Sequence, residues 1–236
     1  MVRFSVPSGN SGLADALIEN GGLDYFDSIT YDSEAAASTR KTMLTKGGTN
    51  ITIVESWSSN TSYATINGYK LDGYKYSTYT RFFGYGYKVD NAIVLLGSND
   101  DSYSSSGYYG RPLVICKTKK GGACVITPRP TFTSAESSDK TYTPEVTATN
   151  DMVATLHTFM VSPEGEARNL RFRLCQQNNY DNIITTANFY TAYDQTKDVY
   201  FCLNRPYFGT AAPFAIEIDS VPYMSFAYNT ILVKST

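Results

Sequence analysis

The chain contains a single histidine, His157, and this limits the nucleophilic chemistry that the sequence can support. A Ser-His-Asp arrangement would have to use it, yet it lies in the run 156–159, which has the pattern of a strand. No G-x-S-x-G motif accompanies it, and neither a Walker-type loop nor G-x-G-x-x-G occurs. The segment 84–87 is only a fragment of such a loop, and its aromatic setting favours a β-bulge. His157 is therefore expected on a strand face or in the core.

Carboxylates are the other residues that could do chemistry, because glycoside hydrolysis needs two acids across a cleft. The candidates are scattered, and several look like turn residues: Glu34, Glu55, Asp72, Asp90, Glu217 and Asp219. The run 99–101 resembles a cation-holding loop but lacks the full D-x-[DN]-x-[DN]-G pattern. The sequence thus predicts no catalytic residue, no cofactor and no metal site, with a β-fold glycoside hydrolase as the least favoured alternative.

The four cysteines are Cys116, Cys124, Cys175 and Cys202. The first two flank a hairpin turn at 117–123, where a three-residue loop over 119–121 would place them directly opposite each other. A loop of two or four residues would instead pair Cys116 with Val125. Zinc is disfavoured because no C-x-x-C occurs. We expect reduced, buried cysteines, while a bridge between Cys116 and Cys124 stays open.

The 20 tyrosines are the most unusual feature of the composition. Tyrosine favours strands, and it also gives large contact areas with a polar tip at interfaces. Both roles can hold together, and an aromatic face could meet protein or stack a glycan. The candidate interface aromatics are Tyr69, Tyr74, Tyr76, Tyr79, Tyr85, Tyr87, Tyr103, Tyr108 and Tyr109.

The charge balance argues against direct contact with nucleic acid. Lys plus Arg is 20 and Asp plus Glu is 22, so no basic excess can neutralise a phosphate backbone. The segment 1–12 has no apolar core typical of a signal peptide, and no apolar run reaches membrane-spanning length. We therefore expect a protein made in a cytoplasm, with no membrane contact.

These residues must be positioned mainly by strands. One helix is expected over 13–19, with Ser11 as its cap and Gly21-Gly22 at its end. A second, short helix is conceivable over 33–40. From Met43 onward, short strands alternate with turn signals such as Asn67-Gly68, which predicts a two-residue hairpin. The fold class is all-β, mainly antiparallel, as a sandwich or barrel-like structure of one or two units.

A polar segment at 131–150 interrupts this pattern and is the best candidate for a linker or long surface loop. The expected organisation is an N-terminal arm and helix over 1–28, a first β unit over 29–130, that linker, and a second β unit over 151–236. Pro128 and Pro130 are expected to end the strand before the linker. In the second unit, the run 170–174 alternates strictly, with one apolar and one cationic face.

The chain resembles structural proteins of tailed bacteriophages, most clearly over 93–127 and 212–236. The resemblance lies in its composition: a Ser-, Thr-, Asn- and Tyr-rich β body with few charges and repeated short hairpins. It implies a non-enzymatic virion component (capsid decoration, connector, tail or baseplate) that binds its own copies and other virion proteins after assembly in the host cytoplasm. A receptor- or glycan-binding β module on a fibre or cell surface is the alternative.

Overall fold

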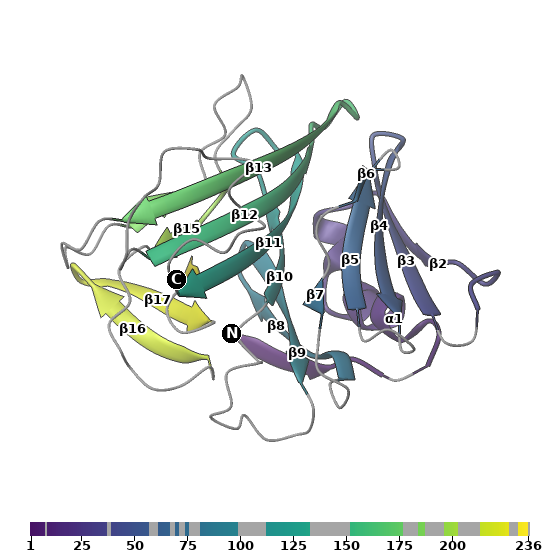
Figure 1. Cartoon of the computed structure of the whole chain (residues 1–236), viewed down its shortest axis with the longest axis horizontal. Coiled ribbons are helices and arrows are strands. Elements are labelled where there is room, and N and C mark those ends of the chain that lie inside the picture. The colour runs from purple at the N-terminus through teal and green to yellow at the C-terminus, as the bar shows by residue number, and fades with distance from the viewer. Residues whose placement is uncertain are drawn as a thin grey trace.

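Antiparallel strands make up most of the computed structural model, which confirms the expected all-β class with one short N-terminal helix (Figure 1). The residues that the structure describes are 1–7, 9–36, 39–56, 61–66, 69–70, 74–75, 81–98, 112–132, 152–176, 184–186, 196–202, 213–226 and 231–235. Within them the strands form three sheets, which we name by position: a central sheet, an N-terminal sheet and a C-terminal sheet.

The central sheet has seven strands in the order β1-β8-β9-β10-β11-β12-β13. From β8 onward, each strand pairs with the one that follows it along the chain, while β1 adds to the outer edge of β8. The strands are β1 (Val2–Ser5), β8 (Arg81–Val89), β9 (Ala92–Ser98), β10 (Pro112–Lys117), β11 (Ala123–Phe132), β12 (Met152–Val161) and β13 (Ala167–Gln176).

The other two sheets lie on either side of the central one (Figure 1). The N-terminal sheet comprises β2 (Ser28–Tyr31), β3 (Thr39–Lys46), β4 (Thr49–Ser56), β5 (Thr61–Ile66), β6 (Tyr69–Lys70) and β7 (Tyr74–Lys75). The C-terminal sheet comprises β14 (Ile184–Thr186), β15 (Val199–Cys202), β16 (Phe214–Ile218), β17 (Val221–Phe226) and β18 (Ile231–Lys234).

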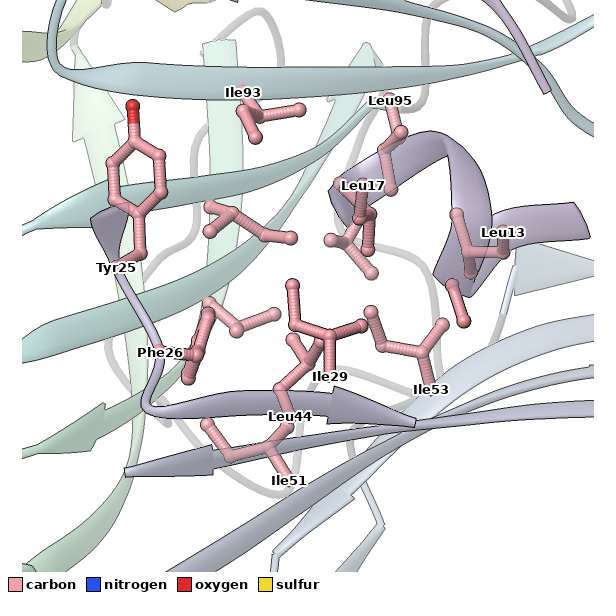
Figure 2. Packing of buried hydrophobic residues seen from close by; sticks show 14 of the residues in the cluster. Leu13, Leu17, Tyr25, Phe26, Ile29, Leu44, Ile51, Ile53, Ile93 and Leu95 are labelled. Carbon is pink, nitrogen blue, oxygen red and sulfur yellow. The ribbon is translucent and has the colours of Figure 1, made fainter. Parts of the chain in front are cut away.

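A helix fills the space between the N-terminal and central sheets. α1 (Gly12–Glu19) buries Leu13 and Leu17, and Gly21 adopts the left-handed backbone (φ 83°) that closes helices, before the 3-10 turn η1 (Gly22–Asp24). Ser11 is at the predicted cap position, but its side chain makes no capping hydrogen bond. Figure 2 shows α1 between Ile93 and Leu95 of the central sheet and the N-terminal sheet below it.

Both faces of the central sheet are covered, which explains its apolar middle strands. In β9, Ile93 and Leu95 face α1 and the N-terminal sheet, whereas Val94 and Leu96 face the C-terminal sheet. All four side chains are fully buried. A sheet covered on both faces needs apolar residues at consecutive positions, while a sheet wetted on one face alternates. Burying each such side chain contributes about 1.5–3 kcal/mol.

A β-bulge in β8 changes the face on which its aromatic residues lie. The register shifts between Phe83 and Tyr85, so that Phe83 packs in the core on the α1 side, while Tyr87 belongs to the core on the opposite side. Without the extra residue, Gly84, positions 83, 85 and 87 would share one face. The bulge expected over 84–87 is therefore confirmed.

The hairpin turns follow the sequence signals. Ile66 pairs with Tyr69 across the Asn67-Gly68 signal. Asp219 and Ser220 both have positive φ, 51° and 61°, in the two-residue turn between β16 and β17. Gly165 (φ 92°) lies in the turn between β12 and β13.

Two expectations about the chain's elements were wrong. The helix over 33–40 does not form: Asp32 starts a turn in which its carboxylate accepts a hydrogen bond from Glu34 N–H, and β3 begins at Thr39. Pro128 and Pro130 do not end β11, which continues to Phe132. Both prolines come after Ile126, the last residue of β11 that pairs with β10. From there on β11 pairs only with β12, so a backbone N–H on the β10 side is not required and proline is tolerated.

The strands on either side of the expected linker belong to the same sheet. β11 and β12 pair along ten residues, from Ala123 with Val161 to Phe132 with Met152. The boundary expected at 131–150 therefore falls within the central sheet. Thr131 and Phe132 are strand residues, and 133–150 lie outside the described residues.

Candidate functional site

The strongest concentration of charge in the described interior is an ion pair between Arg40 and Glu55. Arg40 Nη2 lies 2.8 Å from Glu55 Oε1, and the two side chains are 4% and 0% exposed. They face each other across β3 and β4, where Arg40 is paired with Glu55 in the register. The N-terminal sheet thus buries both charges against the rest of the molecule.

The ion pair also holds elements outside the N-terminal sheet. Glu55 Oε1 accepts a hydrogen bond of 3.1 Å from the backbone N–H of Phe83, beside the β8 bulge. Arg40 Nη1 donates to the carbonyl oxygens of Pro7 and Gly9, in the segment between β1 and α1. One ion pair therefore connects the N-terminal arm, the N-terminal sheet and the central sheet.

Burial dominates the electrostatics of Glu55. Removal from water raises its pKa from 4.5 to about 7, although the Arg40 guanidinium and the Phe83 N–H act in the opposite direction. Within the described part of the chain, Glu55 Oε2 and the Thr42 hydroxyl are buried without a hydrogen-bond partner. A buried oxygen without a hydrogen-bond partner lowers the stability of the fold, unless a water molecule donates to it or it binds a proton.

This arrangement is a structural junction. A catalytic acid must reach a reacting group, and Glu55 is completely buried. The other acids that the structure describes do not join it: Glu34 and Asp219 lie in turns, Asp90 is in the β8–β9 turn, and Glu217 is exposed on β16. Asp72 lies outside the described residues.

The partner of Glu55 was missed in the sequence analysis, although a signal for it existed. Gly47-Gly48 is a two-residue turn in which both glycines have positive φ, and Lys46 pairs with Thr49 across it. Counting outward from that turn brings Arg40 opposite Glu55. The assignment of 33–40 to a helix concealed this pairing.

His157 takes the strand position that was expected for it. It pairs with Thr127 of β11 and Arg171 of β13 near the middle of the central sheet. Two register positions further along, Arg129, Thr155 and Arg173 are paired across the same three strands. In the register, Arg171 from the run 170–174 is therefore the β13 residue opposite His157.

Cys116 and Cys124 are directly opposite each other in β10 and β11, as the three-residue loop predicted. The hairpin closes with Thr118 N–H donating to the Gly122 carbonyl and Gly122 N–H donating to the Thr118 hydroxyl. Both cysteines are free and buried. Burial and the neighbouring Cys116 side chain raise the pKa of the Cys124 thiol well above its usual value, which disfavours its reactive thiolate form.

The candidate interface tyrosines separate into two groups. Tyr85 and Tyr87 are only 7% and 4% exposed, because Arg3 lies over the Tyr85 ring at 4.1 Å and Phe226 meets the edge of Tyr87 at 5.7 Å. These two rings are already covered within the chain and offer almost no surface to a partner.

The remaining seven candidate tyrosines have no described side chain. Tyr69 and Tyr74 are backbone positions in β6 and β7. The other five lie outside the described residues: Tyr76, Tyr79, Tyr103, Tyr108 and Tyr109.

Among the described residues, no cluster of three or more His, Cys, Asp or Glu side chains could hold a metal ion. The described helices include none that is long and apolar enough to cross a membrane. No protein-family model, curated protein or solved structure matches the chain.

Proposed function

We propose that this chain is a non-enzymatic structural subunit of a bacteriophage virion, which works by self-assembly and by contact with other virion proteins. The main support for the proposal is that, within the described part of the chain, the central sheet ends in two edge strands and does not close into a barrel. Its end strands, β1 and β13, each pair on one side only among the described strands. Unpaired strand edges present rows of N–H and C=O groups that can pair with another chain.

The length of β13 strengthens the case for assembly. This edge strand has ten residues, Ala167 to Gln176, all of them in register with β12 and with no proline among them. Proteins that stay monomeric commonly shorten such an edge or interrupt it with a proline or a bulge. Pairing of the β13 edge with a strand of another subunit would extend the central sheet across the contact.

The virion part of the proposal rests on composition. The two segments with the style of tailed-bacteriophage structural proteins, 93–127 and 212–236, include the buried strands β9 and β10 and the hairpin of β16 and β17. Capsid decoration, a connector, a tail component and a baseplate component all fit a subunit that works through contacts.

Sedimentation velocity of the purified chain tests self-assembly. We expect the mean mass to rise with concentration through the micromolar range, toward a defined multiple of 26.1 kDa. A monomer throughout that range would contradict the self-assembly. Mass spectrometry of purified virus particles tests the location, and stoichiometric recovery of the chain is expected. Its absence from the particles would contradict the virion role.

A further inference from the structure

Two sheets of this chain end in strands that carry opposite charges. β13 is the last strand of the central sheet, and β16 is the last strand of the C-terminal sheet. Each pairs on one side only among the strands that the structure describes, and neither contains a proline. In Figure 1, β13 lies at the top of the view and β16 at the lower left, so these two edges of one chain do not meet. Strand edges of this kind can pair with a strand of another molecule.

Charged residues recur at alternate positions along both strands. In β13, Arg171 and Arg173 alternate with apolar residues over 170–174. In β16, the exposed residue Glu217 follows half-buried Ile216, and Asp219 comes two positions later, in the turn to β17. Residues two apart in a strand share one face of its sheet. The cationic positions of one edge therefore have the same spacing as the anionic positions of the other.

These charges favour the pairing of unlike edges. Antiparallel pairing of two β13 strands about Phe172 would put Arg171 of each copy opposite Arg173 of the other. Pairing of two β16 strands would bring two copies of Glu217 near each other. Like charges directly opposite each other destabilise a strand pair, whereas opposite charges stabilise it. The edge of β13 is therefore better matched by β16 of a second copy than by a second β13.

We propose that β13 of one copy pairs with β16 of the next, which joins the central sheet of one chain to the C-terminal sheet of its neighbour. The inference rests on the proposed function and names the surfaces through which the subunits assemble. An antiparallel alignment that puts Arg173 opposite Glu217 also brings Arg171 to the level of Asp219. Backbone hydrogen bonds supply the attraction between the strands, and the charge pairs select the partner and the register.

The contact is head-to-tail, because it joins two different surfaces of the chain. Head-to-tail contacts repeat around a closed ring or along a filament. The defined mass that we expect for the assembly corresponds to a ring, in which every copy uses both edges.

Charge reversal on each edge, followed by sedimentation velocity of the full chain, tests the pairing. We expect Arg173→Glu and Glu217→Arg each to raise the concentration needed for association by roughly tenfold, because a like-charge pair replaces an opposite-charge pair. The double variant, Arg173→Glu with Glu217→Arg, restores opposite charges and should recover most of the wild-type association. Lys120→Glu and Glu34→Arg make the same changes of net charge at exposed positions in turns, and should leave association unchanged.

Each other outcome has a separate meaning. If the wild type associates and neither single reversal weakens it, these edges are not the contact, while self-assembly stands. The inference is also overturned if the double variant associates no better than the single variants, or if the two control variants weaken association equally. A wild-type monomer at every concentration overturns both the pairing of the edges and the self-assembly.

Urea unfolding at concentrations below the association range checks that each variant folds like the wild type. Should Arg173→Glu not fold, the comparison of Glu217→Arg with Glu34→Arg still decides the matter. Weaker association in the first variant alone supports the β16 edge as part of the contact, and equal association in both overturns the inference.

Discussion

The Arg40–Glu55 pair buries two opposite charges in a sheet and ties three parts of the chain together. Two buried charges cost desolvation free energy that their attraction often fails to recover. What the pair contributes is connection: its hydrogen bonds reach the arm at Pro7 and the central sheet at Phe83. Because Oε2 of Glu55 has no partner among the described residues, protonation should be tolerated at near-neutral pH.

Glu55 should therefore make stability depend on pH. Its folded pKa of about 7 exceeds the ordinary value of 4.5, so the folded chain holds the proton more tightly than the unfolded chain. The resulting stabilisation is full below pH about 4.5 and is lost as the pH rises through about 7, on the order of 3 kcal/mol in total. Urea unfolding at pH 5 and pH 8 should show that Glu55→Gln removes this loss.

A surface glutamate provides the control for this substitution. Glu217 is exposed on β16, and Glu217→Gln removes the same charge without a buried partner. It should leave the difference between pH 5 and pH 8 as in the wild type. An equal loss of stability with pH in Glu55→Gln would show that another group titrates.

Removal of Arg40 should be more damaging than removal of a neighbouring lysine. Arg40→Gln leaves the Glu55 carboxylate buried without its counter-charge, which costs about 3–5 kcal/mol at pH 8 and less at pH 5, where Glu55 carries a proton. Lys41→Gln loses only an exposed ion pair, with Nζ 3.5 Å from Asp32, and should cost less than about 1 kcal/mol. Equal costs in urea unfolding would contradict the buried role of Arg40.

At the scale of elements, a contact between two turns connects the N-terminal sheet to the β12–β13 hairpin. The Thr49 hydroxyl donates a 2.6 Å hydrogen bond to the Gly165 carbonyl, and Gly47 lies against Gly165. Gly165 has a φ of 92°, and a Cβ there would overlap the Gly47 carbonyl oxygen. Both the backbone conformation and the space therefore require glycine at this position.

Two glycine substitutions should separate these requirements. Gly48→Ala has the strain of positive φ (79°) but open space around the new Cβ, and should cost about 1–2 kcal/mol. Gly165→Ala has similar strain and a backbone clash as well, and should cost more than Gly48→Ala, by roughly 1–3 kcal/mol. Thermal unfolding of both variants measures the difference, and equal costs would show that the two turns separate freely.

For the whole molecule, the central sheet should couple the two cores into one folding unit. Its two faces belong to different cores, and side chains that alternate along a single strand serve both. Loss of either outer sheet would expose one face of the central sheet to water. The central sheet would then be less stable, and the other outer sheet packs against it. We therefore expect one cooperative unfolding transition, where independent β units over 29–130 and 151–236 would give two.

One core substitution on each side tests this coupling. Leu44 of the N-terminal sheet and Phe226 of the C-terminal sheet are both fully buried. Leu44→Ala and Phe226→Ala should destabilise the chain by about 2–5 and 3–5 kcal/mol, and each should lower the single transition in calorimetry. Two transitions, with each variant shifting only one, would show that the layers fold separately.

Local signals in the sequence determined much about the elements. Alternation and glycine signals predicted short strands from Met43 onward and the helix α1, and the hairpin at 117–123 limited the residue opposite Cys116 to Cys124 or Val125. These features depend on backbone preferences and on side chains within a few residues, so they can be derived from a short stretch of chain. Of the two errors, the one at 33–40 came from overlooking the Asp32 turn and the neighbouring β3–β4 hairpin, and the one at Pro128 and Pro130 arose because β12, which comes after the segment 133–150, pairs with β11.

Only the tertiary structure decided which faces are covered and which residues meet. Burial of Glu55 with Arg40, the covering of Tyr85 and Tyr87, and the ion pair between Lys88 and Asp24 all depend on the way three sheets and a helix stack. The pairing of Arg40 with Glu55 follows from a local hairpin, but the burial of the two side chains depends on layers contributed by other parts of the chain, which no local pattern encodes. The sequence by itself determined an all-β chain, and the packing of its layers decided which surfaces stay open for another molecule.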